Sequence, residues 1–180
     1  MSVSLPTVPN AIVAHIVAAS VRHAIPVHLI AALCAKESSF DPRAWNPEPR
    51  YRYLWDCAAG KPFRKLTPEE NASEIPPRDF TKIGGPLDQE WWGQQASWGL
   101  MQVMGGNARE HGFRGVFFTE LCDPATGIEY GCRYFARLLA RNTVEEAVSA
   151  YNWGHPSPEN YEDYVHPVMR YAAGYKAAGV

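Results

Sequence analysis

The stretch Leu29–Pro42, LIAALCAKESSFDP, contains a carboxylate in an unusual position. At helical spacing Ile30, Leu33, Cys34 and Glu37 fall at positions i, i+3, i+4 and i+7, so they share one face of a helix. Three of these residues are typical of a core. An apolar environment raises the pKa of a carboxyl group, which can then keep its proton near neutral pH and donate it to a leaving group. The pattern predicts a general acid; a glutamate held by an arginine or by helix-end geometry is the structural alternative.

Three later segments carry side chains suited to a ligand. Ser97–Gln102, SWGLMQ, places small residues and Gly99 beside the amide of Gln102, which both donates and accepts hydrogen bonds. Ala150–Gly154, AYNWG, ends a helix with two aromatic residues, an amide and a glycine C-cap. Tyr164 lies on the last expected helix. Each segment alone is also typical of capping and packing, so the prediction depends on their combination.

Most of the chain shows helical periodicity, with no repeats and no long alternating strand pattern. We therefore expect a mainly α, single domain over residues 1–180. Its helix starts carry N-cap residues, a capping box, or proline in the first turn. The expected helices are Pro9–Ala24, Pro26 to about Ser38, a segment resuming at Gly99, Ala125–Ala140 after Asp123-Pro124, Thr143 through Ala150, and Tyr161–Lys176.

Residues 43–96 differ from the rest because they are rich in proline and aromatic residues and have no sustained period. Thr67-Pro68-Glu69-Glu70 can cap one short helix there. Disordered segments are poor in aromatic residues, so we expect an ordered insert, either a flap or a wall. Trp91 and Trp92 are candidates for stacking on a ligand or for packing.

Composition excludes several classes of function. The 180 residues are 46% hydrophobic and 20% charged with a net charge of −2, which offers no basic surface for nucleic acid. No apolar run reaches the roughly 18 residues that a membrane span needs. The N-terminal stretch has no lysine or arginine before its apolar region, which predicts synthesis in the cytoplasm without a signal peptide.

Cysteine and histidine spacing does not indicate a metal site. The four cysteines, Cys34, Cys57, Cys122 and Cys132, match no zinc motif, so we expect buried or free thiols. His155 and His166 with nearby acids are poorly spaced for ligands.

In this order the motifs resemble the soluble lytic transglycosylases of the lysozyme-like superfamily. The matching segments are Glu37-Ser38, Gly99–Gln102 (GLMQ), Ala150–Asn152 (AYN), Tyr164 on the following helix, and the helix that begins at Asp123-Pro124. The resemblance covers roughly residues 26–45 and 97–175. The insert at 43–96 is longer than the usual link and is similar to inserts in phage and prophage enzymes.

The resemblance implies a lysozyme-like (goose-type/lytic transglycosylase) helical fold and cleavage of the β-1,4 bond between N-acetylmuramic acid and N-acetylglucosamine in peptidoglycan. It implies Glu37 as acid and then base, 1,6-anhydro product ends, and no metal or organic cofactor. The substrate-binding positions that carry over are Ser38, Gly99, Met101, Gln102, Tyr151, Asn152 and Tyr164.

Two other functions compete with this one. A hydrolytic muramidase requires a second carboxylate, about 6.5–9.5 Å from Glu37 if the enzyme inverts, and Asp88 and Glu90 are the sequence candidates. A non-catalytic glycan-binding or phage structural module would keep the fold without the reaction. As an enzyme, the chain is expected to be a monomer that acts on glycan strands of the cell wall. A pore-forming phage release protein, or carriage in the virion, would bring it there.

Overall fold

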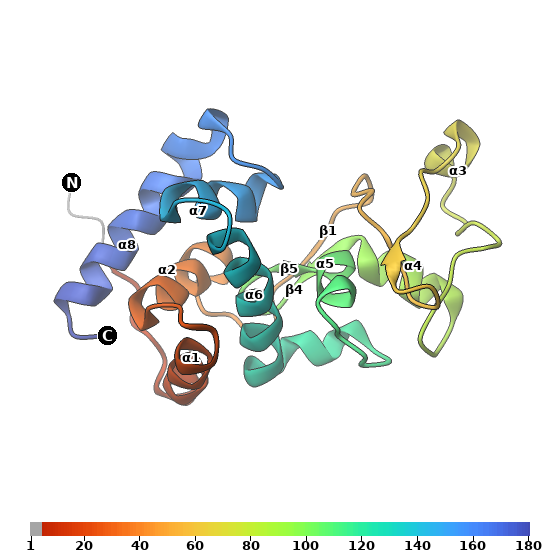
Figure 1. The fold of residues 1–180 in the computed structure, drawn as a ribbon. Coiled ribbons are helices and arrows are strands. Elements are labelled where there is room, and N and C mark those ends of the chain that lie inside the picture. Colours follow the sequence, from red (N-terminus) through yellow and green to blue (C-terminus); the bar gives the residue numbers. More distant parts are fainter. Residues whose placement is uncertain (1–4) are drawn as a thin grey trace.

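The structure is a computed structural model that describes residues 5–180. Residues 1–4, part of the N-terminal stretch considered for a signal peptide, lie outside the described residues. A bundle of helices forms one part of the molecule, and the strands, α4, α5 and the insert extend from it, with α3 at the far end (Figure 1). The fold is mainly α, as the sequence predicts. None of the helices described is long and apolar enough to cross a membrane.

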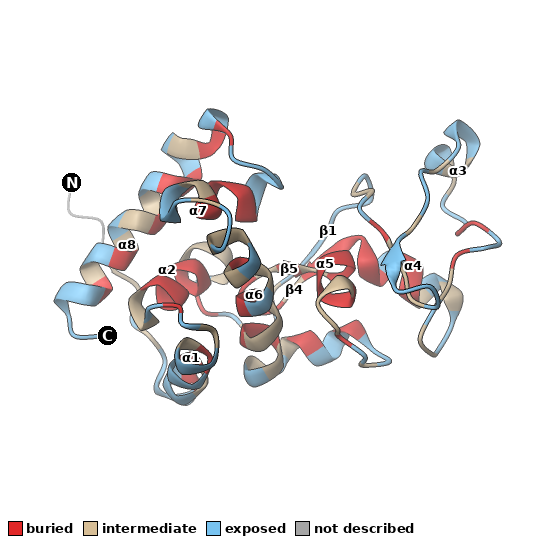
Figure 2. Ribbon diagram, viewed as in Figure 1, coloured by how far each residue is buried: buried red, intermediate tan, exposed pale blue. Residues whose placement is uncertain are grey.

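Helix α2 is the central element of the bundle. Residues Ile30–Cys34 along it are completely buried, and the helix packs most extensively against α8 (Figure 2). A helix that is apolar on all sides is stable only when other helices surround it. The sequence predicted one apolar stripe here, whereas the structure buries every face of α2 before Lys36. The helices of the bundle are α1 (Asn10–His23), α2 (Val27–Ser38), α6 (Pro124–Leu139), α7 (Val144–Trp153) and α8 (His166–Ala177).

The capping signals in the sequence locate the helix starts correctly. The Asp123 side chain accepts a hydrogen bond from the Thr126 backbone N–H at 2.9 Å, at the start of α6. Thr143 forms the predicted capping box at the start of α7, and Thr67 does the same for α3. These local hydrogen bonds satisfy backbone donors that the helix itself leaves free, so they are visible in sequence.

A small antiparallel sheet joins the bundle to the insert. Its order is β1-β4-β5, with Trp45 opposite Trp98 and Ser97 opposite Met104. The sequence predicted that helices resume at Gly99, which is wrong for residues 99–104. Gly99–Gln102 form the turn between two strands, and the next helix begins at Gly105. The strands and helices of this region are β1 (Trp45–Pro47), β2 (Trp55–Asp56), β3 (Lys61–Pro62), α3 (Pro68–Ala72), α4 (Leu87–Gln94), β4 (Ala96–Trp98), β5 (Val103–Met104), α5 (Gly105–Glu110) and η1 (Phe118–Cys122).

The insert is ordered around a cluster of its own. Leu54, Phe80 and Trp91 are buried together, and the Phe80 ring meets the Trp91 ring edge to face with centroids 5.2 Å apart. Its outer part, around α3, is exposed (Figure 2). Only the first residues of the insert therefore remain available to line a cleft beside α2.

Candidate active site

Glu37 lies in the last turn of α2, at the floor of a cleft of about 790 Å³. The helix ends at once because Ser39 and Phe40 both have positive φ, at 52° and 65°. This conformation is unusual for residues other than glycine, and such strain is common at functional sites. The C-terminal end of a helix carries partial negative charge, which disfavours an ionised carboxylate there.

The surroundings of Glu37 favour its protonated form. Burial raises the pKa of its carboxyl to about 7; the hydrogen bond from Tyr164 and the charge of Lys36 oppose the rise, and the charge of Glu48 adds to it. The Tyr164 hydroxyl donates directly to Oε1 of Glu37. The carboxyl can therefore hold a proton near neutral pH and is fixed in orientation by one hydrogen bond.

Tyr164 reaches Glu37 from a widened helical turn. The sequence predicted an α-helix over Tyr161–Lys176, but the structure has a π-helix, η3 (Tyr161–Val165), before α8. Pro167 explains the interruption, because proline has no N–H to donate to the carbonyl four residues earlier, on Asp163. Single turns of π-helix are frequent at functional sites, and this one carries the tyrosine that contacts Glu37.

Replacing Tyr164 by phenylalanine is expected to raise the pKa of Glu37 further, because the hydrogen bond that stabilises the carboxylate is lost. The alkaline limb of kcat/KM should move to higher pH by up to about one unit, and activity should fall about tenfold because the carboxyl loses its orientation. The pH profile measures both. A limb that stays in place with full activity would show that this hydrogen bond has no role in the reaction.

Tyr151 and Asn152 lie on the helical wall of the cleft, at the end of α7. The Tyr151 hydroxyl donates to the backbone oxygen of Met101 at 2.7 Å, and its ring lies against that of Tyr134 with centroids 5.2 Å apart. Asn152 accepts a hydrogen bond on Oδ1 from Asn160 at 3.0 Å. Tyr151 thus connects the helical wall to the strand turn through a hydrogen bond. The Asn152 side chain uses its oxygen within the protein, so its amide N–H groups are available to a ligand in the cleft.

Gln102 lines the opposite wall and holds the turn between β4 and β5. Its Nε2 donates to the backbone oxygens of Ala44 and Gly99, each at 3.0 Å, and its Oε1 accepts from Ser97 at 2.9 Å. Gln102 itself has a φ of 46°, and these bonds hold it there. The residue is in the cleft, as expected, but its polar atoms are already paired within the protein.

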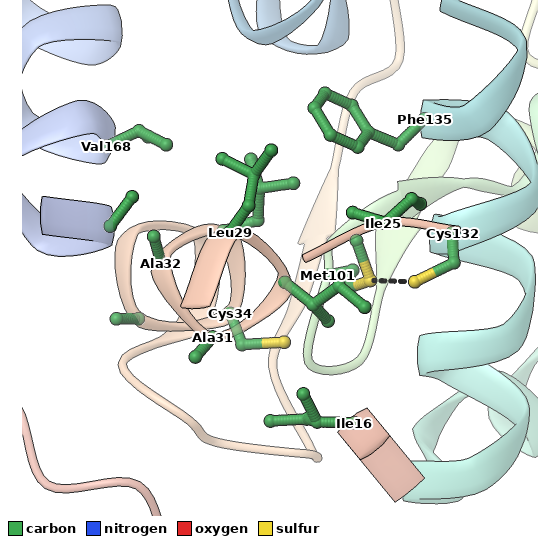
Figure 3. Close-up of a cluster of buried hydrophobic side chains, with 14 of the residues drawn as sticks. Ile16, Ile25, Leu29, Ala31, Ala32, Cys34, Met101, Cys132, Phe135 and Val168 are labelled. Carbon is green, nitrogen blue, oxygen red and sulfur yellow. Dashed lines mark hydrogen bonds between the residues drawn. The ribbon is translucent and has the colours of Figure 1, made fainter. Parts of the chain in front are cut away.

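Met101 and Gly99, which the resemblance predicted as substrate-binding residues, do not line the cleft. The Met101 side chain is 0% exposed and lies in the core beside Cys34 and Cys132 (Figure 3), so only its backbone is near the cleft. Gly99 has a φ of 69°, and a Cβ there would lie 2.3 Å from the Leu121 backbone oxygen. The absence of a side chain at Gly99 therefore allows close packing against Leu121 and does not bring the backbone close to a ligand.

Ser38 follows the acid in sequence but does not line the cleft. Its hydroxyl donates to the backbone oxygen of Leu100 at 2.8 Å. This bond joins the end of α2 to the strand turn. Ser38 therefore supports the position of Glu37 without facing the ligand space.

The sequence candidates for a second carboxylate are also misplaced. Glu90 is fully buried in an ion pair with Arg109, with Nε and Oε1 2.8 Å apart, and Asp88 is exposed on α4. Neither lines the cleft, and nor do Trp91 and Trp92. Trp91 belongs to the buried cluster of the insert, so packing explains it. Glu48 and Glu110 are the carboxylates that the structure brings to the cleft beside Glu37.

Most of the opposite wall was not indicated by any direct signal in the sequence. Tyr51 and Tyr53 follow β1, and the Tyr51 hydroxyl donates to Asn107 Oδ1 on α5 at 3.1 Å. Hydroxyl, amide and ring faces on two walls suit a polar ligand with flat apolar surfaces, as a sugar has. The cleft residues that were not predicted are Asn46, Glu48, Tyr51, Tyr53, Ser97, Met104, Asn107, Glu110, Tyr134, Arg137, Leu138, Arg141, Trp153 and Gly154.

Within residues 5–180, no group of three or more histidine, cysteine, aspartate or glutamate side chains is placed to hold a metal ion. All four cysteines are free, and Cys34 and Cys132 are buried.

A mainly helical domain with a protonatable glutamate on the floor of an open polar and aromatic cleft is typical of enzymes that cleave polysaccharides. The sequence model of the family described as "Transglycosylase SLT domain" matches residues 15–169. The chain belongs to this family, whose members are peptidoglycan lytic transglycosylases, lyases that act on a polysaccharide. Searches of curated proteins and of solved structures gave no match.

Proposed function

We propose that this protein cleaves the β-1,4 bond between N-acetylmuramic acid and N-acetylglucosamine with Glu37 as its only catalytic carboxyl, leaving 1,6-anhydromuramic ends. The observation that carries the proposal is the position of Glu37 at the cleft floor, where burial raises its pKa to about 7 and Tyr164 orients it. A group with this pKa is available both as an acid and as a base near neutral pH.

The reaction needs one proton donor that later recovers a proton. Protonated Glu37 gives its proton to the glycosidic oxygen, and the bond from this oxygen to C1 of the muramic residue breaks. The carbonyl oxygen of the 2-acetamido group stabilises C1, so a second enzyme carboxylate is not required. Glu37, now ionised, takes the proton of the C6 hydroxyl, and O6 bonds to C1 while the acetamido oxygen leaves.

The wall residues have roles that follow from their positions. Asn152 offers its amide N–H groups to an acetamido oxygen, and Tyr151 and Tyr134 present ring faces beside the acid. Tyr164 keeps the Glu37 carboxyl aimed into the cleft. Gln102 and Ser38 hold the strand turn and the end of α2, so they act through the shape of the site.

The alternative is a hydrolase, and Glu48 is the observation that favours it. Its side chain lines the same cleft, and its charge acts on Glu37, so it could activate a water molecule. Mass spectrometry of glycan fragments from digested cell walls separates the two reactions. We expect anhydro ends, which weigh 18 Da less than reducing ends. Reducing muramic ends, lost on Glu48→Gln substitution, would overturn the proposal in favour of the hydrolase.

A further inference from the structure

The end of helix α6 and the turn that follows it present one stripe of side chains to the cleft. Tyr134, Arg137, Leu138 and Arg141 all line the cleft, and they fall at positions i, i+3, i+4 and i+7. Residues at this spacing share a face where the chain is helical. Arg141 is the last member of the stripe and lies two residues past Leu139, where α6 ends.

The two arginines of the stripe differ in their partners. Arg137 forms an ion pair with Glu110, which is itself a cleft residue, so its charge is largely neutralised. Arg141 is exposed, and among residues 5–180 no acidic side chain lies within ion-pair distance of it. Arg141 therefore brings an unpaired positive charge to the cleft.

Tyr134 marks the part of the stripe that lies near Glu37. Tyr134 packs on Tyr151, and both lie close enough to Glu37 and Tyr164 to share their electrostatic environment. Arg141 is at the other end of the stripe, seven residues beyond Tyr134 and just after the end of α6. It is thus placed to contact part of a long ligand away from the point of cleavage, where binding energy improves positioning.

We propose that Arg141 is a specificity-determining residue that binds a carboxylate carried by the glycan strand. This inference rests on the proposed function, because it takes peptidoglycan as the ligand. Peptidoglycan offers that chemistry in two forms, namely the carboxylates of a peptide stem and, where the stem is absent, the lactyl carboxylate of muramic acid. Arginine matches a carboxylate with two parallel N–H donors, which lysine cannot do.

Because the net charge of the protein is negative, a local positive charge matters more for binding an anionic glycan. At −2 overall, the chain gains no long-range attraction to an anionic polymer. An unpaired arginine that lines the cleft attracts the carboxylate at short range, and because Arg141 is exposed this attraction weakens as the salt concentration rises.

Three substrates and one matched control test the inference. The substrates are peptide-bearing glycan, glycan freed of peptides by an amidase, and this second glycan after its carboxylates are converted to methylamides. Arg141→Ala is compared with Arg170→Ala, which removes an exposed arginine of α8 outside the cleft. We expect Arg141→Ala to lower kcat/KM about fivefold, mainly through KM, on at least one carboxylate-bearing glycan and to have no effect on the methylamide.

Each outcome decides the proposal. Loss confined to peptide-bearing glycan identifies the stem carboxylates as the ligand, and loss on the amidase-treated glycan identifies the lactyl carboxylate. Equal loss on all three substrates, no loss on any, or the same loss for Arg170→Ala overturns the proposal. The loss should shrink in 0.5 M salt and be only partly restored by Arg141→Lys.

A binding measurement keeps this test separate from the proposed reaction. Dissociation constants for the same three glycans, measured with Glu37→Gln and with Glu37→Gln/Arg141→Ala, require no cleavage. A fivefold weaker affinity confined to a carboxylate-bearing glycan supports Arg141 even if the product analysis rejects the anhydro mechanism. Unchanged affinity rejects Arg141 even if anhydro ends are found.

Discussion

Glu37→Gln is expected to lower kcat on peptidoglycan by at least about 1000-fold while the protein remains folded. Glutamine keeps the size of the side chain and its place at the end of α2, but an amide cannot donate an acidic proton to the glycosidic oxygen. General acid–base catalysis typically contributes factors of 100 to 10,000, and here one group would supply both steps. Loss of turbidity of purified cell walls, together with fragment analysis, measures the effect.

The matched control is Glu69→Gln, which removes an exposed glutamate in the first turn of α3, far from the cleft. It should retain the activity of the unmodified protein. A Glu37→Gln variant with comparable activity would remove the catalytic assignment. An unmodified protein that binds glycan without cleaving it would indicate the non-catalytic module.

The stability of Glu37→Gln gives an independent check on the pKa. The pKa of this carboxyl rises from 4.5 to about 7 on folding, so its protonated form favours the folded state. Its contribution to the free energy of unfolding is complete below pH 4.5 and is lost as the pH rises through 7. The shift corresponds to about 3 kcal/mol. The variant should therefore gain stability relative to the unmodified protein between pH 5 and pH 8, measured by urea unfolding. A difference that does not change with pH would contradict the raised pKa.

Local signals in the sequence were enough to select Glu37 as the candidate acid and to locate the helices of the bundle. Glu37 stands out because its type conflicts with the face it occupies, and Asp123 and Thr143 mark helix starts through hydrogen bonds to residues three positions later. Such features depend on spacing within one segment. They are therefore visible before any tertiary contact is known.

The opposite wall of the cleft could not be predicted in this way. Strands β1, β4 and β5 have only two or three residues each, too few for an alternating pattern. Glu48 reaches the cleft because it directly follows β1, which pairs with β4 about 50 residues away in sequence, and no local rule gives that pairing. The stripe that ends at Arg141 was detectable in principle, since its four members have helical spacing.

Glu90 shows how a buried carboxylate can have a structural role. Like Glu37, Glu90 is a glutamate on a helix close in sequence to one of the family motifs, here Gly99–Gln102. Unlike Glu37, it accepts two hydrogen bonds from Arg109, each of 2.8 Å. Arg109 also donates to the backbone oxygens of Phe113 and Gly115. The pair joins α4 of the insert to α5, which carries Asn107 and Glu110 on the cleft wall.

Arg109→Met is expected to reduce the free energy of unfolding by about 3–5 kcal/mol, because it leaves the Glu90 charge buried without its partner. For a chain of this size, this corresponds to a fall of roughly 10 °C in Tm. Thermal and urea unfolding at pH 7 measure it. The matched control is Arg64→Met in the exposed pair of Arg64 with Glu70 and Asp79, which should cost much less stability because water screens exposed ion pairs.

The double variant Glu90→Gln/Arg109→Met separates the cost of a lone charge from the cost of lost packing. Removing the charge as well should restore part of the stability that Arg109→Met loses, since a buried neutral amide is less costly than a buried carboxylate. Equal and small losses for Arg109→Met and Arg64→Met would show that burial does not make this pair important. A large loss that the double variant does not relieve would assign the effect to the Arg109 contacts with the backbone oxygens of Phe113 and Gly115, which connect the end of α5 to the segment that follows it.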